Sequence, residues 1–359
     1  MFWLQSRTLS KLANGKIEMI KVYDFFSGCG GTSCGLSQAG LEIVTGLDSD
    51  RDAASTYRMN IKGASFLETD IRSLSEEALD LKTHGGAPIL FCGCAPCQPF
   101  SKQNRNLDFN DPRRNLLSEF GRFVQRWTPD YVLVENVPGL QRVSPDEGPL
   151  RSFISLLNSL NYSFVSGVLP ALWYGVPQTR ERFILIASLK AGVFLPPASH
   201  GLGLKSPSTV EDWIGELPSI AAGETHSDDP DHQAARLSDL NLDRIAHTPE
   251  GGGREAWPEA LRLECHKFHK GHSDVYGRLS WKKPAAGLTT RCISYSNGRF
   301  GHPTQDRAIS VREAASLQTF PDWYKFSGSL ASRARQIGNA VPPLMAKQIG
   351  EAIISHALQ

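Results

Sequence analysis

Segments typical of strands and of helices alternate along the first 190 residues, and this alternation restricts the fold more than any other feature of the chain. Helical spacing is clear in Leu116, Phe120, Phe123 and Val124, which recur on one face. The predicted strands are 20–26, 41–48, 64–70, 89–92, 131–137, 162–168 and 182–187, and the predicted helices are 32–39, 51–60, 75–81, 115–127 and 150–160. Such βαβ alternation predicts an α/β protein with a doubly wound, mainly parallel sheet.

The alternation stops after residue 188, where proline and glycine become frequent. Six prolines between positions 196 and 249, followed by three consecutive glycines, indicate a loop-rich second region. Helical patterns return at 311–317 and 342–358. We predict a first domain over residues 1–194, a smaller loop-rich domain over 195–300, and a C-terminal segment, 301–359, that returns to the first domain.

The composition is that of an ordinary globular protein, with 40% apolar and 21% charged residues. No apolar run approaches the roughly 20 residues that a membrane helix requires, and the N-terminus lacks the apolar core of a signal peptide. Seven cysteines, an odd number, favour reduced thiols in the cytosol. These features predict a cytoplasmic protein with no membrane partner.

Charge is distributed unevenly along the second half of the chain, although the net charge is only +1. Residues 211–259 hold 12 acids against 3 Lys and Arg, and residues 262–299 hold 8 Lys and Arg against 2 acids. The basic stretch is interleaved with aromatic residues. A solvated surface explains this pattern, and so does a surface that contacts phosphates and bases.

A glycine-rich turn follows the first predicted strand and opens a helix. Gly28, Gly30 and Gly31 would let an adenosine cofactor approach the main chain. Asp48 ends the second strand, 20 residues after Gly28, where a carboxylate can hold ribose hydroxyls. Asp70 ends the third strand and is a candidate acceptor for an adenine amino group. These residues alone fit a dinucleotide and S-adenosylmethionine equally well.

A candidate nucleophile, Cys97, follows the fourth predicted strand in a Pro-Cys turn. A free cysteine has a pKa near 8.5, so cationic neighbours would raise its thiolate fraction at neutral pH. Arg180 and Arg182 are candidates for that role or for gripping a substrate. Glu135, at the end of the fifth strand, would be partly desolvated and able to donate a proton.

With these motifs the chain resembles the cytosine-5 DNA methyltransferases of bacterial restriction–modification type, from about Lys21 to His356. Six motifs occur in the family's order: the cofactor turn Asp-Phe-Phe-Ser-Gly-Cys-Gly-Gly at 24–31, the nucleophile motif Pro-Cys-Gln-Pro-Phe-Ser at 96–101, the acid motif Glu-Asn-Val at 135–137, Gln-x-Arg-x-Arg at 178–182, a late helix at 312–322, and Gly-Asn-Ala-Val at 338–341.

The resemblance implies a base-flipping mechanism with S-adenosylmethionine as methyl donor and no metal. The Cys97 thiolate attacks C6 of the flipped cytosine, Glu135 engages N3 and the exocyclic amine, and Arg182 with Arg180 binds the O2 side or a phosphate. The cofactor residues implied by position are Phe26, Gly28, Cys29, Gly30, Gly31, Asp48, Asp70, Ile71, Pro96, Leu116, Asn339 and Val341. The implied DNA contacts are Gln98, Ser101 and Thr289.

The resemblance also gives the domains their expected roles. Residues 1–194 would be catalytic, 195–300 would recognise the target sequence, and 301–359 would return to the catalytic domain because Asn339 has to reach the cofactor. Double-stranded DNA is the expected partner, with a cognate restriction endonuclease in the same system. We expect a monomer that works at the nucleoid of a bacterium.

Two alternatives compete with this interpretation. An RNA cytosine-5 methyltransferase of the same family usually carries a Cys-Phe-Thr element in its recognition region, which this chain lacks. A catalytically idle DNA-binding regulator would have no use for an intact Cys97, Glu135 and Arg182. The Cys/His-rich segment 265–272 suggests a zinc site, but no second ligand pair completes one nearby.

Overall fold

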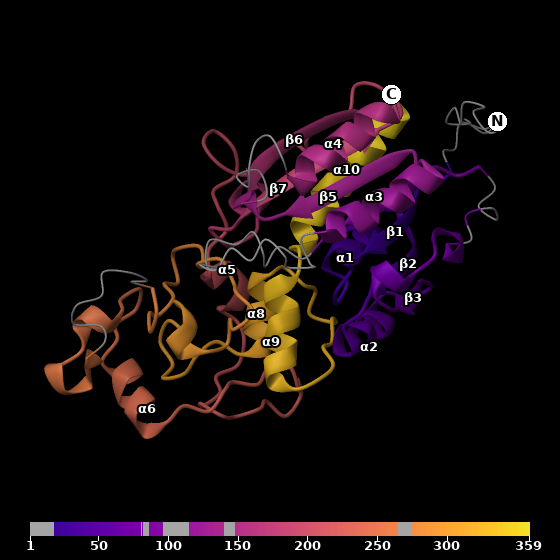
Figure 1. Cartoon of the computed structure of the whole chain (residues 1–359). Helices are drawn as coiled ribbons and strands as arrows, with labels where there is room; N and C mark the ends of the chain where they lie inside the picture. Colours follow the sequence, from indigo (N-terminus) through magenta and orange to yellow (C-terminus); the bar gives the residue numbers. More distant parts are fainter. Residues whose placement is uncertain (1–17, 80, 82–85, 96–114, 140–147, 265–273) are drawn as a thin grey trace. The chain divides into compact units, whose positions relative to one another are not determined.

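The computed structural model describes residues 18–79, 81, 86–95, 115–139, 148–264 and 274–359 (Figure 1). The chain divides into two compact units. The first unit comprises Met1–Leu169, Glu181–Pro197 and Met345–Gln359, and the second comprises Pro170–Arg180 and Ala198–Leu344. The predicted C-terminal segment, 301–359, is therefore divided between the two units. Its residues up to Leu344 belong to the second unit, and those from Met345 onwards belong to the first.

A seven-stranded sheet forms the first unit, in the order β3-β2-β1-β4-β5-β7-β6. Its strands are β1 (Lys21–Phe25), β2 (Glu42–Asp48), β3 (Ser65–Glu68), β4 (Ile89–Gly93), β5 (Tyr131–Asn136), β6 (Ser163–Pro170) and β7 (Glu181–Ser188). The pairs from β3 through β5 are parallel, and β7 is antiparallel to β5. The predicted α/β class with a mainly parallel sheet is therefore confirmed.

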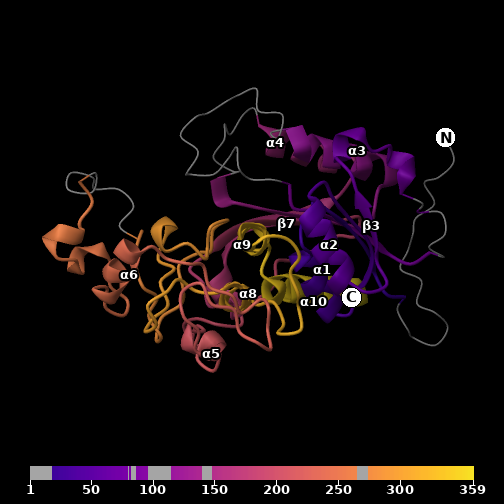
Figure 2. The same cartoon turned by 90° about the horizontal axis from the view of Figure 1, so that it is seen from below.

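Helices cover both faces of this sheet, as Figure 2 shows. One face carries α3 (Leu116–Trp127) and α4 (Pro149–Ser159). The other carries α1 (Gly31–Gln38), α2 (Arg51–Asn60) and α10 (Pro343–Leu358). The helix predicted over 75–81 is wrong. The described residues there form only a 3-10 turn, Glu76–Ala78, which follows another at Ile71–Ser73.

Aromatic side chains fill the space between the sheet and α3. The Phe25 ring lies with its centroid 5.2 Å from that of Phe91, 5.1 Å from Phe120 and 5.2 Å from Phe123. All four rings are buried, and rings of this size contribute much of a core's apolar area. The helical spacing that the sequence shows in α3 is the face that packs on this sheet.

The register of the sheet brings four chain segments to one edge. Phe25, the last residue of β1, lies opposite Leu47 of β2 and Gly93 of β4. Gly93 in turn lies opposite Val134 of β5. The residues that follow each strand therefore emerge at the same edge, where ligands bind in sheets of this type.

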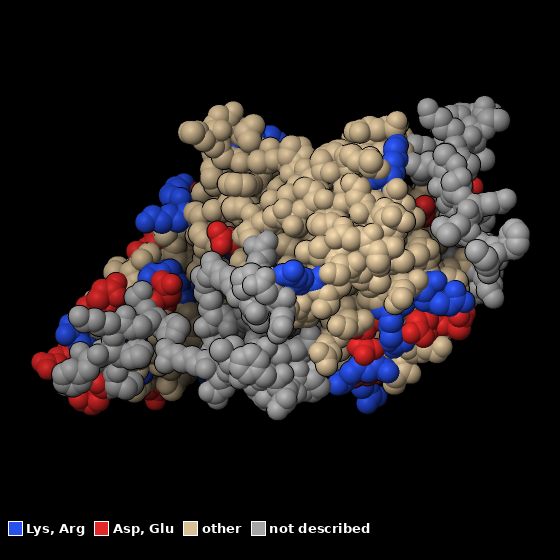
Figure 3. All heavy atoms as spheres, turned by 45° about the horizontal axis from the view of Figure 1, so that its top comes forward, with Lys and Arg blue, Asp and Glu red and all other residues tan. Residues whose placement is uncertain are grey.

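The second unit is rich in loops, with short helices and isolated bridges. Among the described residues its α-helices are α5 (Glu211–Ile214), α6 (Asp239–Ala246), α8 (Val311–Leu317) and α9 (Leu330–Asn339), and its 3-10 turns are Ala171–Tyr174, Arg254–Ala256, Glu259–Leu261 and Tyr295–Asn297. Tyr295, an aromatic residue of the basic stretch, is buried in this unit, and so is Phe300 directly after the stretch. Basic and acidic side chains lie beside one another on the face shown in Figure 3.

Buried arginines hold the loops of the second unit together. Arg278 donates to the main-chain carbonyls of Thr248, His302 and Ile245, at 2.6, 2.8 and 2.8 Å. Its guanidinium therefore forms its hydrogen bonds inside the unit. Loop carbonyls that lack a helical or sheet partner must be satisfied in some other way, and a five-donor guanidinium does this efficiently.

A second buried arginine, Arg307, forms a two-pronged ion pair with Glu313 at the start of α8. The two Nη–Oε distances are both 2.7 Å, and the two side chains are 0% and 1% exposed. Glu313 also accepts from the main-chain N–H of Ser310, completing a capping box. Burial alone would raise the pKa of Glu313, but the bonds from Arg307 hold it below its ordinary value.

Replacing Glu313 with alanine should cost about 3–5 kcal/mol of stability, because it leaves the buried Arg307 charge without its carboxylate partner. Urea unfolding followed by fluorescence measures the loss. Glu211→Ala removes an exposed partner of Lys282 and serves as control, with an expected cost under about 1 kcal/mol. Equal losses for the two variants would contradict the role given to the buried pair.

Candidate active site

In the glycine-rich turn after β1, residues 26–31, three of the six residues have a left-handed backbone conformation. Phe26, Gly28 and Gly30 have φ angles of 57°, 52° and 93°. A positive φ is uncommon for a residue with a bulky side chain, and such strain is often found at functional sites. The N–H of Ser27 binds the carbonyl of Leu47 at 3.0 Å. The turn is thus fixed to the end of β2 before it enters α1.

Asp48 joins the end of β2 to this turn. Its Oδ2 accepts from the N–H of Gly28 at 2.9 Å, and its Oδ1 accepts from the N–H of Asp50 at 2.9 Å. Burial raises the pKa of Asp48, and these main-chain bonds oppose the rise. Each oxygen keeps a further lone pair with which to accept a ribose hydroxyl. The spacing of 20 residues noted in the sequence is therefore a direct contact in the fold.

The surroundings of the turn fit an adenosine cofactor. A Cβ atom built on Gly28 meets no atom within 4 Å, so the space beside this residue is open among the described residues. The buried hydroxyl of Ser27 has no hydrogen-bond partner in the described part of the chain. An open space lined by an unused hydroxyl and a fixed carboxylate suits a polar ligand such as a nucleoside.

Three further residues of the predicted cofactor set lie in the first unit. Asp70 accepts from the Nε of Arg72 at 3.0 Å, and this bond lowers its pKa. Ile71 is buried directly after it, and its carbonyl accepts from Arg122 of α3 at 2.6 Å. Leu116 is buried in the first turn of α3. The chain thus ties the segment after β3 to α3.

Glu135 and Arg182 meet at the end of β5. The Nε of Arg182 lies 2.6 Å from Oε1 of Glu135, and each side chain is 12% exposed. Burial raises the pKa of Glu135, and the charge of Arg182 opposes part of that rise. A raised pKa lets a buried carboxyl keep its proton to a higher pH than an exposed one does, which favours proton donation.

Comparison with known proteins identifies the family. A model of C-5 cytosine-specific DNA methylases matches residues 20–355. The chain belongs to this family. The Type II methylase M.HgiDII of Herpetosiphon aurantiacus is 39% identical over 92% of this chain and 94% of its own length. The Type II methyltransferase M1.HphI of Haemophilus parahaemolyticus is 33% identical over 92% and 86%.

A solved structure supports the same fold. An Escherichia coli protein, described as a DNA modification methyltransferase encoded within a prophage, superimposes with a TM-score of 0.74 at 24% identity. The match covers 94% of this chain and 99% of that one. The predicted resemblance to cytosine-5 methyltransferases is confirmed, and the family implies S-adenosylmethionine as the methyl donor.

The nucleophile motif of this C-5 methylase lies outside the described residues, and with it the predicted Pro96, Cys97, Gln98 and Ser101. The described chain ends just before them, at Ala95. The N–H of Cys94 binds the carbonyl of Phe25 at 3.3 Å, and the carbonyl of Ala95 accepts from the amide of Asn136 at 3.0 Å. The approach to the motif is therefore fixed to the ends of β1 and β5.

Arg180, Thr289, Asn339 and Val341 belong to the second unit. The Nη1 of Arg180 donates to the carbonyls of Leu288 and Gly338, at 3.0 and 3.1 Å. Arg180 thus joins the segment that contains Thr289 to the last turn of α9, where Asn339 lies. Asn339 is exposed, and Val341 is buried just beyond the helix.

Two residues of the motifs have contacts that sequence reasoning did not assign. Asn136 is buried and binds the chain next to the nucleophile motif, as described above. Gln178 is fully buried, and its Nε2 donates to the carbonyl of Leu317 at 2.7 Å, while its Oε1 accepts from the N–H of Leu288 at 3.0 Å. Membership of a motif was the only signal available for either residue.

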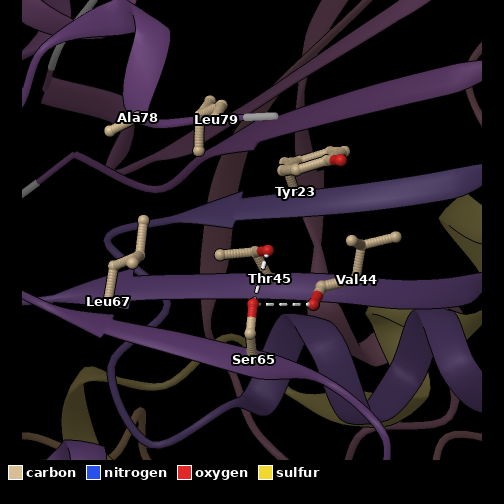
Figure 4. A pocket seen from close by; sticks show the side chains of 7 residues that line it. All are labelled: Tyr23, Val44, Thr45, Ser65, Leu67, Ala78 and Leu79. Atoms are coloured by element: carbon tan, nitrogen blue, oxygen red, sulfur yellow. Dashed lines mark hydrogen bonds between the residues drawn. The ribbon is translucent and has the colours of Figure 1, made fainter. Parts of the chain in front are cut away.

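A cavity of about 260 Å³ lies on the face of the sheet near the second 3-10 turn (Figure 4). Its lining residues are Tyr23, Val44, Thr45, Ser65, Leu67, Ala78 and Leu79. None of them belongs to the predicted cofactor set, and hydrogen bonds of Ser65 to Thr45 and to the Val44 carbonyl occupy its polar wall. Within the described residues we find neither a helix able to span a membrane nor a cluster of metal ligands.

Replacing Arg182 with glutamine should raise the pKa of Glu135 further, because it removes the nearby positive charge that opposes the effect of burial. Infrared titration of ¹³C-glutamate-labelled protein measures the shift, with the band of Glu135 assigned by its loss in Glu135→Gln. Arg58→Gln is the matched control, since Arg58 pairs with the more exposed Glu68. A pKa of Glu135 that moves equally in both variants would contradict the pairing.

Gly338→Ala should destabilise the second unit, because the added Cβ would lie 2.0 Å from the carbonyl oxygen of Thr289. Overpacking of this kind costs about 1–3 kcal/mol or more when the obstacle is rigid main chain. Gly121→Ala in α3 is the control, since its Cβ meets only side chains, the nearest at 3.1 Å. Thermal unfolding compares them, and a Gly338 variant as stable as the control would refute the close contact.

Proposed function

We propose that the chain transfers a methyl group from S-adenosylmethionine to C5 of a cytosine within a short sequence of duplex DNA. Family membership supports the reaction class. The observation that carries the chemistry is the buried pair of Glu135 and Arg182 at the end of β5. It combines a carboxyl of raised pKa with a fixed guanidinium, which suits one edge of a cytosine ring.

S-adenosylmethionine, when bound, supplies an electrophilic methyl group. We propose that the turn at Phe26, Gly28, Cys29, Gly30 and Gly31 binds it. Asp48 would accept hydrogen bonds from the ribose hydroxyls, and its bond to the N–H of Gly28 would hold the turn and the carboxylate in one arrangement. The remaining proposed contacts are Asp70, Ile71, Pro96, Leu116, Asn339 and Val341.

The target cytosine must leave the stack before its ring carbons become accessible. We propose that the thiolate of Cys97 then forms a bond to C6, while Glu135 gives a proton to N3 and accepts from the exocyclic amine. Addition of the thiolate to C6 displaces the electron pair of the C5–C6 double bond, and this makes C5 nucleophilic towards the methyl group. Loss of the proton from C5 restores the C5–C6 double bond and expels the Cys97 thiolate.

Arg182 is proposed to bind the O2 side of the base, since its guanidinium already lies against Glu135. Arg180 directs its Nη atoms at main-chain carbonyls, so we propose that it supports the pocket through those segments. Gln98, Ser101 and Thr289 are proposed contacts to DNA. We propose residues 1–194 as the catalytic domain, 195–300 as the target-recognition domain, and 301–359 as the part that completes the cofactor site.

The named relatives are bacterial Type II methylases. We therefore propose that the chain protects DNA against a cognate restriction endonuclease, acts as a monomer at the nucleoid, and requires no metal. Every motif of the reaction occurs once in a single chain, which supports the monomer.

Methyl transfer from labelled S-adenosylmethionine to duplex DNA tests the proposal. We expect label in 5-methylcytosine at one short motif, located by bisulfite sequencing. Cys97→Ala should abolish transfer, and Glu135→Gln should lower kcat about 10²-fold or more, because a positioned general acid contributes about 10²–10⁴-fold. Label on transfer RNA and not on DNA would overturn the proposed substrate, and DNA binding without any transfer would overturn the proposed reaction.

A further inference from the structure

The first residue of the cofactor motif 24–31 is a buried carboxyl that the proposed mechanism does not use. Asp24 lies on β1, two residues before Phe26, and is 1% exposed. Its Oδ2 accepts from the hydroxyl of Ser33 at 2.6 Å. Its Oδ1 has no hydrogen-bond partner among the described residues. Burying a carboxyl oxygen without a hydrogen bond lowers the stability of the fold, so a carboxyl in this position calls for a functional or structural explanation.

The carboxyl begins a hydrogen-bonded chain that reaches two helices. The Ser33 hydroxyl, in the first turn of α1, lies 2.8 Å from the hydroxyl of Tyr57 in α2. Because Ser33 gives its one proton to Asp24, Tyr57 must be the donor to Ser33. The two helices that flank the cofactor turn are therefore tied to the strand that leads into it.

A glycine on β2 leaves room for this series of hydrogen bonds. A Cβ built on Gly46 would lie 2.5 Å from the ring of Tyr57, so the ring passes directly over this glycine. Gly46 is the β2 residue paired with Asp24 in the sheet. Any larger residue at position 46 would push the Tyr57 hydroxyl away from Ser33.

We propose that Asp24, Ser33 and Tyr57 are positioning residues for the cofactor turn. Through these hydrogen bonds they hold the start of α1, and with it the turn, in the position in which the turn binds S-adenosylmethionine. This inference rests on the proposed binding of the cofactor at that turn. Since the ionised carboxylate is the stronger acceptor for Ser33, the turn is held most firmly when Asp24 is charged.

The groups facing Asp24 make its charge sensitive to pH. They are Ser33 on α1, Tyr57 on α2, Asp48 at the end of β2, and the thiols of Cys92 on β4 and of Cys94 just after it. Burial raises the pKa of Asp24 to about 7, and the charge of Asp48 adds to the rise, while the bond from Ser33 opposes it. Cofactor affinity is therefore expected to increase as the pH rises through 7.

Binding of S-adenosylhomocysteine by the full chain, measured by titration calorimetry, tests the positioning role without turnover. Tyr57→Phe keeps the ring and removes only the hydroxyl, and it should weaken binding about fivefold, the equivalent of one lost hydrogen bond. Tyr162→Phe is the matched control. It also removes a buried hydroxyl bond, to the carbonyl of Pro129, but at the distant β6 side of the sheet. It should lose stability and keep its affinity.

The pH dependence gives a readout that a general loss of stability would not change. Affinity is measured from about pH 6 to 8.5 for the wild type and for Asp24→Asn, which retains the shape and the acceptor. Titration of the ligand amine is common to both proteins, so the difference between the two profiles reports Asp24 together with its coupling to the Asp48 charge. We expect the variant to lack the rise that the wild type shows near pH 7.

Identical profiles, or equal affinity in Tyr57→Phe and the wild type, would overturn the inference. Equal weakening in Tyr57→Phe and Tyr162→Phe would overturn it as well, since loss of stability would then explain the effect. A wild type that fails to bind S-adenosylhomocysteine would instead reject the proposed cofactor site. Methyl transfer to DNA by the wild type, measured separately, keeps the two failures distinct.

Discussion

The parallel pairing of β1 with β2 and β4 is the constraint on which the active site depends. It sets Phe25 opposite both Leu47 and Gly93, so the segments that follow these strands emerge together. The pairing of β4 with β5 adds Glu135 to the same edge. Residues from distant parts of the sequence are thereby brought together by the strands, and the loops need only complete the geometry.

Three carboxyls at this edge, of which Asp48 is half-buried and the other two are buried, have different partners. Asp48 accepts from main-chain N–H groups, Glu135 pairs with an arginine, and Asp24 accepts from the hydroxyl of Ser33. Because the strength of the partner decides how far burial is offset, the three groups are expected to hold protons differently at one pH. If the site binds ribose, protonates a base and holds a turn, as proposed, it makes use of these differences.

The sequence predicts the first unit well because its signals are local. Strand and helix periodicity gives the sheet, and the 20-residue interval between Gly28 and Asp48 follows from a strand–helix–strand crossover of fixed size. The short 3-10 turn at Glu76–Ala78 was missed because a few apolar residues cannot distinguish one turn from a helix. The contacts of Arg180 and Gln178 join residues more than 100 positions apart, and no local pattern records them.

The architecture of the second unit is difficult to predict from the sequence. Arg278 and Arg180 bind main-chain carbonyls, which every residue supplies whatever its side chain. Loop side chains are therefore able to change while these bonds persist. If this unit reads DNA, as proposed, such a framework separates the stability of the loops from the side chains that contact bases. The catalytic edge has no such freedom, because its chemistry is carried by the side chains themselves.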